Sequence, residues 1–253
     1  MNNATLLFLG TGTSEGVPRV SCLTHPEKHC EVCHDAIKVG SPNRRRNTSI
    51  LISKTLKNKK KLNVLIDVGK FFYESSMNWF PPNTIKTIDA IVLTHSHADA
   101  VGGLDDLRDW TNNTQNIINV YLRKTDLASI SQSYDYLVDR SKQTGGGGVA
   151  NLKFNVINHN PFEVCGIKFT PLPVIHGPTQ LANGYRFGNV TYISDTSSIP
   201  SETQKLISGS EILILDALRP RKTHGTHFTL EEAIAFARTV KPNKTLFTDA
   251  AHD

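Results

Sequence analysis

Two histidines and an aspartate stand close together in one short segment of this 253-residue chain. His95, His97 and Asp99 follow the apolar run 88–93, which predicts a buried strand. Side chains two residues apart share one face of an extended chain, so a loop after this strand can turn both imidazoles to the same side. Neutral imidazoles and carboxylates are typical ligands of zinc, manganese and iron. The segment therefore predicts a metal site rather than a solvated polar loop.

Further histidines and carboxylates follow later strand-like runs. A metal ion bound by such groups can generate hydroxide near neutral pH, and a second ion can neutralise charge on a phosphate oxygen. This pattern predicts two metal positions that share one aspartate. We expect the first position to be formed by His95, His97, His176 and Asp195, and the second by Asp99, Asp195 and Asp249.

Three cysteines lie close together near the N-terminus, at positions 22, 30 and 33. Thiolates at this spacing suit tetrahedral zinc, with a fourth ligand supplied from elsewhere. Clustered cysteines fit a disulfide framework poorly and favour a metal site in a reducing compartment. The alternative is three reduced cysteines with a packing role. Histidines near the cluster are candidates for the fourth ligand: His25, His29 and His34.

The amino-acid composition is that of a globular protein. Hydrophobic residues make up 38% of the chain and charged residues 20%, as in globular proteins with a sizeable core. Neither a bilayer-spanning run nor a secretory leader is visible, so we expect an intracellular, cytoplasmic location and no membrane partner. The net charge of +5 favours an anionic partner. Much of the excess lies in 54–61, which reads as a solvated hairpin turn, so nucleic acid is not the favoured partner.

Three adjacent arginines, Arg44, Arg45 and Arg46, precede the strand-like run 50–52. Guanidinium groups match phosphate oxygens bidentately. Side chains alternate along an extended segment, so the three cannot all point the same way. We expect at least one of them to bind substrate or a structural carboxylate. The expected substrate is a small anionic phosphate, and a homodimer is allowed.

Strand-like runs outnumber helical ones along the chain. Apolar periodicity predicts helices over 71–80, 125–137 and 230–240. Thr229 and Glu232 form a capping-box pattern, which places His227 just before the last helix. Periodicity alone gives an α/β or α+β class. We expect one domain over 1–253, with a small Cys/His zinc-binding insertion near 19–36.

The segment His95-Ser96-His97-Ala98-Asp99 resembles the His-x-His-x-Asp signature of the metallo-β-lactamase superfamily. The resemblance implies an α/β fold, a four-layer αββα sandwich with the metal site at one edge of its two sheets. It also implies that the glycine-rich segment 10–18 borders the site.

A narrower resemblance joins the opening Gly-Thr-Gly loop, the cysteine cluster and the closing strand with its histidine. These features resemble the phosphoribosyl cyclic phosphodiesterase family of the carbon–phosphorus lyase pathway. That family implies a structural zinc held here by Cys22, Cys30, Cys33 and His252. It also implies that His227, with His224 as an additional candidate, acts on the leaving group or phosphate; as general acid, His227 would protonate a departing alkoxide.

Two positions depart from the family pattern. The histidines of its second metal fall at Ala100 and Asp249. Alanine and carboxylate in place of imidazoles should weaken a zinc-like second site and favour a harder metal such as Mn²⁺ or Mg²⁺. We therefore expect one or two divalent ions at the active site, Mn or Zn, together with one structural zinc.

The leading hypothesis is a metal-dependent phosphodiesterase that cleaves a small cyclic or nucleotide-like phosphate with metal-activated water. One alternative is a nuclease like those that process tRNA 3′ ends, which is less favoured because the basic runs are short and no extended insertion is visible. Another is a catalytically weakened metal-binding scaffold, which Ala100 suggests. The presence of Asp99, Asp195 and Asp249 argues against full loss of the site.

Overall fold

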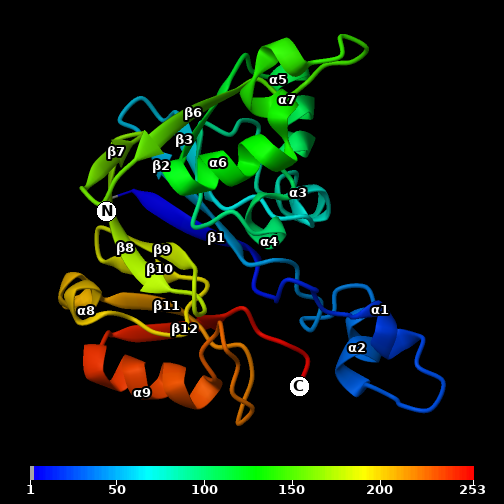
Figure 1. Ribbon diagram of the computed structural model, residues 1–253, viewed down its shortest axis with the longest axis vertical. Coiled ribbons are helices and arrows are strands. Elements are labelled where there is room, and N and C mark those ends of the chain that lie inside the picture. Colours follow the sequence, from blue (N-terminus) through cyan, green and yellow to red (C-terminus); the bar gives the residue numbers. More distant parts are fainter. Residues whose placement is uncertain (1–2) are drawn as a thin grey trace. The chain divides into compact units, whose positions relative to one another are not determined.

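The computed structural model describes residues 3–253, and within them the strands form two six-stranded mixed sheets (Figure 1). This confirms the expected α/β class. The chain divides into two compact units. The first holds residues 3–9 and 49–171, and the second holds residues 10–48 and 172–253.

The first unit is built on one complete sheet in the order β1-β2-β3-β4-β5-β6. Its middle strands contain the buried apolar runs 50–52, 64–66 and 90–92, as expected for strands covered on both faces. Leu51, Leu65 and Ile91 belong to its buried cluster. The strands are β1 (Ala4–Gly10), β2 (Ser49–Thr55), β3 (Lys61–Ile66), β4 (Ala90–Val92), β5 (Ile118–Arg123) and β6 (Leu152–Ile157). The helices of this unit are α3 (Phe72–Trp79), α4 (Ala98–Val101), α5 (Arg108–Asn113), α6 (Lys124–Ser133) and α7 (Asp135–Val138), with 3₁₀ turns at Asp105–Leu107 and Arg140–Lys142.

Parallel pairing of β3 with β4 positions the first group of polar residues. Ile66 pairs with Val92, so both strands end at the same edge of the sheet. The chain leaves β3 at Asp67, whose backbone N–H donates to the Val92 carbonyl at 3.1 Å. It leaves β4 towards Thr94 and His95. Residues 27 positions apart in the sequence are thus brought together at this edge.

The second unit contains most of the other sheet, whose order is β12-β11-β10-β9-β8-β7. Strands β10, β11 and β12 run parallel, and Ile193, Leu215 and Phe247 share one register line. Their carboxyl ends therefore bring Asp195, Asp216 and Asp249 to one edge. The strands are β9 (Leu181–Phe187), β10 (Val190–Ile193), β11 (Ile212–Asp216) and β12 (Lys244–Thr248); β8 (Ile167–Ile175) passes from the first unit into the second, and β7 (Phe162–Val164) pairs with its first-unit part.

The last helix, α9 (Leu230–Val240), has the predicted bounds and the predicted capping box at Thr229 and Glu232. Its Phe236 and Ala237 pack against the buried cluster that also contains Leu213 and Leu215. The segment predicted as one helix over 125–137 is instead α6 and α7. Tyr134 separates them because its φ of −136° and ψ of 54° are not helical.

The cysteine-containing segment, residues 17–36, has few buried apolar side chains of its own. Its helices are α1 (Val20–Leu23) and α2 (Glu31–Ala36). Elsewhere in the second unit lies a further helix, α8 (Ser201–Ile207). Val17, Cys33 and Ala36 are the buried apolar residues of the cysteine-containing segment, with Cys22 and Cys30 partly buried against them. So few apolar side chains do not stabilise an independent fold, and such segments usually need a cross-link or a metal.

None of the helices described within residues 3–253 is both long enough and apolar enough to span a bilayer.

The capping box gives a test of how α9 is held. Thr229→Ala removes the hydroxyl that accepts from the Glu232 backbone N–H, and we expect a loss of about 1 kcal/mol in the free energy of unfolding. Urea unfolding measures it. Thr239→Ala is the matched control, because that hydroxyl lies exposed on the same helix and donates only to the Phe236 carbonyl. Equal stabilities of the two variants would contradict a role for the cap.

Candidate functional site

The three clustered cysteines meet one histidine within the second unit. The Sγ atoms of Cys22, Cys30 and Cys33 lie 3.6, 3.2 and 3.4 Å from Nδ1 of His252. The four ligand atoms lie within 4.8 Å of one another. The predicted zinc ligands are therefore brought together from positions up to 230 residues apart.

This geometry fits zinc better than hydrogen bonding. A ring nitrogen has one proton or one lone pair, so it cannot form good hydrogen bonds with three sulfurs at once. Tetrahedral zinc with ordinary Zn–S and Zn–N bonds separates sulfur from nitrogen by about 3.6 Å, close to the observed spacing. Burial raises the pKa of the Cys33 thiol to about 11, so a cation is needed to hold it as the thiolate. Burial also lowers the pKa of His252, which favours the neutral, ligating imidazole.

The local histidines make other contacts. Nδ1 of His25 accepts from the backbone N–H groups of Glu27 and Lys28. Nδ1 of His34 lies 2.9 Å from the Cys30 carbonyl, and its ring lies against that of His29. The fourth position among the sulfurs is taken by His252, from the far end of the sequence.

In the first unit, Asp67 orients His95 through Thr94. The Thr94 hydroxyl donates its one proton to Asp67 Oδ2 at 2.8 Å. Towards His95 the Thr94 Oγ1 atom can then only accept, so the 2.8 Å contact with His95 Nδ1 places a proton on Nδ1. The lone pair of His95 is then on Nε2. This is the tautomer that a metal needs, fixed by a carboxylate behind the ligand. His95 is 1% exposed, so the orientation is set within the protein interior.

The other residues of the same loop differ in exposure. His97 is exposed and its ring lies 4.7 Å from that of His95, centroid to centroid. Asp99 Oδ1 lies 3.8 Å from His95 Nε2. Ala100 is buried in the apolar cluster of the first unit and supplies no ligand atom. The unit thus presents two imidazoles and one carboxylate.

In the second unit, a backbone carbonyl orients His176. Because the Thr226 carbonyl can only accept, the 2.9 Å contact puts the proton on His176 Nδ1 and the lone pair on Nε2. Ligand atoms of His176, Asp195 and His227 lie within 4.8 Å of one another. His176 and Asp195 are each 3% exposed.

His227 also contacts two buried carboxylates. Its Nδ1 lies 2.9 Å from Asp216 Oδ2 and 3.1 Å from Asp249 Oδ2. Burial acts to lower the pKa of His227, but the hydrogen bonds and charges of the two carboxylates raise it to about 11. Burial raises the pKa of Asp216 to about 7, and it also raises that of Asp249 well above the usual range. Two buried carboxylates therefore share one imidazole and retain affinity for a cation.

The remaining predicted residues lie in the second unit. The side chains of the three arginines donate to backbone carbonyls: Arg44 to Ala36, Arg45 to Ala251 and Arg46 to Val17. These bonds tie the cysteine-containing segment to its neighbours, and a substrate role for the arginines stays a prediction. His224 is exposed, and its Nδ1 lies 2.9 Å from the Thr226 hydroxyl.

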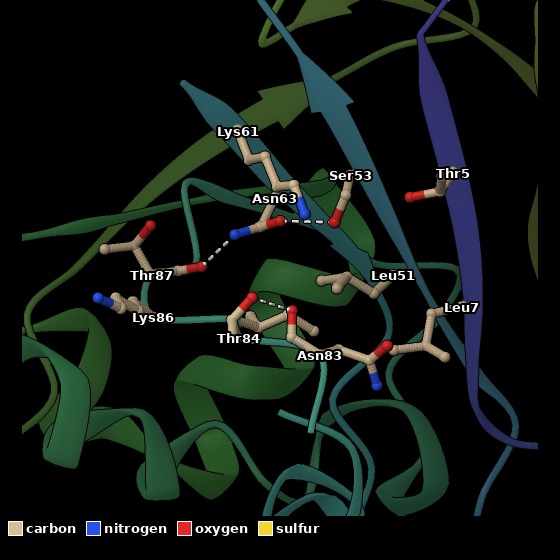
Figure 2. A pocket seen from close by; sticks show the side chains of 11 residues that line it. Thr5, Leu7, Leu51, Ser53, Lys61, Asn63, Asn83, Thr84, Lys86 and Thr87 are labelled. Atoms are coloured by element: carbon tan, nitrogen blue, oxygen red, sulfur yellow. Dashed lines mark hydrogen bonds between the residues drawn. The ribbon is translucent and has the colours of Figure 1, made fainter. Parts of the chain in front are cut away.

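A cavity of about 230 Å³ in the first unit is lined by none of these residues (Figure 2). Leu7, Leu51, Ser53 and Asn63 are among its lining residues, and Asn63 is held by Ser53 and by the Thr87 carbonyl. Its described lining contains lysines but neither histidine nor carboxylate. The cavity therefore lacks the groups needed for metal-dependent hydrolysis.

Sequence reasoning left two contributing residues out of the expected site. Asp216 stands at the end of a strand-like run, as Asp195 does, and this position in the sequence could have identified it. Thr94 carried no signal, because its role depends on which way its hydroxyl points.

Comparison with known proteins agrees with this geometry. The family model described as "Beta-lactamase superfamily domain" matches residues 62–248. The chain belongs to the beta-lactamase superfamily. The crystal structure of a diphosphatase from the PhnP family is 34% identical, with a TM-score of 0.81, covering 99% of this chain and 88% of that one. This places the chain in the PhnP family. The expected metallo-β-lactamase fold is confirmed, and both fold and family are those of metal-dependent hydrolases.

Two further relatives are more distant or much longer. Zn²⁺-bound PqqB from Methylobacterium extorquens is 17% identical with a TM-score of 0.70, covering 98% of this chain and 89% of that one. It shares the superfamily fold, which implies divalent metal binding. An octanoyltransferase from Porphyromonas gingivalis (strain ATCC BAA-308 / W83) is 32% identical over 229 residues, 90% of this chain. The chain spans only 42% of that relative's length.

The link from Asp67 to His95 gives a test of the first-unit histidines. Thr94→Val keeps the shape but removes the hydroxyl, so His95 loses the partner that fixes its tautomer. We expect active-site metal affinity to fall about 10- to 100-fold, measured by chelator competition. Thr94→Ser retains the hydroxyl and should keep the affinity. Wild-type affinity in the valine variant would show that Thr94 does not orient a ligand.

Proposed function

We propose that this member of the PhnP family is a metal-dependent phosphodiesterase that hydrolyses a small cyclic or nucleotide-like phosphate with metal-activated water. The observation that carries the proposal is the orientation of His95 and His176. Each is fixed through Nδ1, by a hydroxyl or a carbonyl, and each therefore has its lone pair on Nε2. The family pattern and the acidic residues at the strand ends support the same proposal.

Most of the proposed ligands match ligand positions of the family pattern, and Asp249 stands where that pattern has a histidine. His95, His97, His176 and Asp195 would hold one divalent ion, and Asp99, Asp195 and Asp249 a second. The carboxylate-rich second set favours Mn²⁺ over Zn²⁺ because harder cations prefer oxygen ligands. A bound ion would supply a hydroxide nucleophile and neutralise phosphate charge. Asp99 would add negative charge beside His95, from which it lies 3.8 Å.

His227 is the proposed residue for the phosphate or the leaving group. A pKa of about 11 keeps its imidazole protonated at neutral pH. A fixed positive charge beside the strand-end carboxylates can stabilise a developing negative charge on oxygen, and its proton can go to a departing alkoxide. Burial and the charge of His227 lower the pKa of His224, so His224 is the neutral partner of the pair.

Turnover of bis-(p-nitrophenyl) phosphate tests the activity. We expect Mn²⁺-stimulated hydrolysis by the wild-type protein, and loss to background in His95→Ala and Asp195→Ala because each removes a proposed ligand. Glu202→Gln is the control, since that side chain forms only an exposed pair with Lys205. Unchanged turnover in either ligand variant would exclude this site. A wild-type protein inactive with every metal would favour a binding scaffold.

The structural zinc has its own test. Cys30→Ser removes one of the converging sulfurs, so we expect loss of about one zinc per chain and a melting temperature lowered by several degrees. Cys165→Ser is the matched control, because Cys165 lies between β7 and β8, outside the cluster. Zinc content is measured by mass spectrometry and melting by circular dichroism. Equal zinc content in both variants would refute the cysteine site.

A further inference from the structure

His252 makes contacts through both of its ring nitrogens. Nδ1 faces the three sulfurs, and Nε2 lies 3.2 Å from Oδ1 of Asp253. A metal-ligating histidine that donates its other N–H to a carboxylate has its tautomer fixed and its basicity raised. Asp253 is therefore placed to orient the ligating ring of His252.

Asp253 in turn contacts Arg219. Asp253 Oδ2 lies 3.7 Å from Arg219 Nη1, and Arg219 Nε donates to the Lys222 carbonyl at 3.3 Å. The Arg219 side chain is 15% exposed, whereas that of Asp253 is 41% exposed. The guanidinium is thus anchored in its own loop and offers a fixed partner to a more exposed carboxylate.

The loop that contains Arg219, residues 217–229, also carries His224 and His227. Its start is bonded to the last strand and its extension: Ala217 N–H donates to the Thr248 carbonyl, and Ala251 N–H to the Leu218 carbonyl. Further along the loop, His227 contacts Asp249. The short segment 249–253 therefore contacts this loop at Asp249, Ala251 and Asp253, and also contributes His252 to the cysteine cluster.

We propose that Asp253 and Arg219 are positioning residues that couple the cysteine–histidine zinc cluster to the loop 217–229, so that bound zinc holds His227 against Asp249. This inference rests on the proposed structural zinc. An ion pair as exposed as Asp253 and Arg219 contributes little stability by itself. Bound zinc immobilises His252, and His252 contacts Asp253. The zinc therefore also restrains the carboxylate that Arg219 contacts, which strengthens the ion pair. The zinc then orders part of the active site as well as stabilising its own segment.

The first measurement follows the metal. Cobalt substituted for zinc gives a thiolate-to-metal charge-transfer band, which reports on the cysteine site and not on the oxygen- and nitrogen-rich site. We expect Asp253→Ala to accelerate cobalt loss to excess EDTA about 10- to 100-fold. Arg219→Gln should accelerate it less, and Arg219→Lys should partly restore the wild-type rate. Lys222→Gln, an exposed lysine in the same loop, is the matched control and should leave the rate unchanged.

The second measurement follows His227. With zinc fully loaded, its imidazole ¹⁵N resonances are recorded for the wild-type protein and the same variants. We expect them to shift and broaden in Asp253→Ala and Arg219→Gln, and to match the wild type in Lys222→Gln. A general loss of stability would change resonances throughout the protein and not only those of His227. The amide resonances of α6 in the first unit therefore serve as the internal reference and should stay unchanged.

The outcomes separate the two proposals. If wild-type protein gives no thiolate-to-cobalt band, the structural zinc itself is refuted. If the band is present but Asp253→Ala releases cobalt at the wild-type rate, Asp253 does not position His252. If release is faster but the His227 resonances are unchanged, the coupling to loop 217–229 is overturned.

Discussion

Parallel strand pairing is the constraint on which the candidate site depends. Backbone hydrogen bonds place the ends of β10, β11 and β12 on one edge, and each strand is followed or ended there by an aspartate. The pairing of β3 with β4 does the same for Asp67 and Thr94 in the first unit. Because these strands are buried, apolar packing fixes their register. A shift by one residue would move every one of these side chains to the other face.

The cost of burying charge explains the chemistry at these edges. Isolated carboxylates in a protein interior take up protons or bind cations. Asp216 and Asp249 are 0% and 2% exposed, and both contact Nδ1 of His227. Asp67 is equally buried but is held by a backbone N–H and a hydroxyl of Thr94. The same residue type thus serves as an orienting group in one unit and as a cation-binding group in the other.

The cysteine-containing segment shows a different route to stability. Where apolar side chains are too few to form a core, three sulfurs and an imidazole lie close enough together to hold a metal cross-link. Three arginines bonded to backbone carbonyls reinforce the same region. Since His252 comes three residues after Asp249, the cysteine–histidine cluster and the strand-end carboxylates share one short stretch of chain. The two groups of candidate ligands in this unit are therefore joined by the backbone.

The sequence by itself determined an α/β or α+β class, the bounds of α9, and the residue types that can bind metals, because these depend on local periodicity, capping and ligand chemistry. Ligand spacing within one segment was also readable, as for His95 and His97. The residues near the cysteines left the fourth ligand open, the family resemblance implied His252, and the tertiary structure places His252 beside the sulfurs. Only the tertiary structure decided that Thr94 transmits the effect of Asp67 to His95. It also placed Asp216 and Asp249 within hydrogen-bond distance of the same imidazole nitrogen of His227. These contacts join residues distant in the sequence, and their geometry depends on strand register and side-chain direction, which no local pattern records.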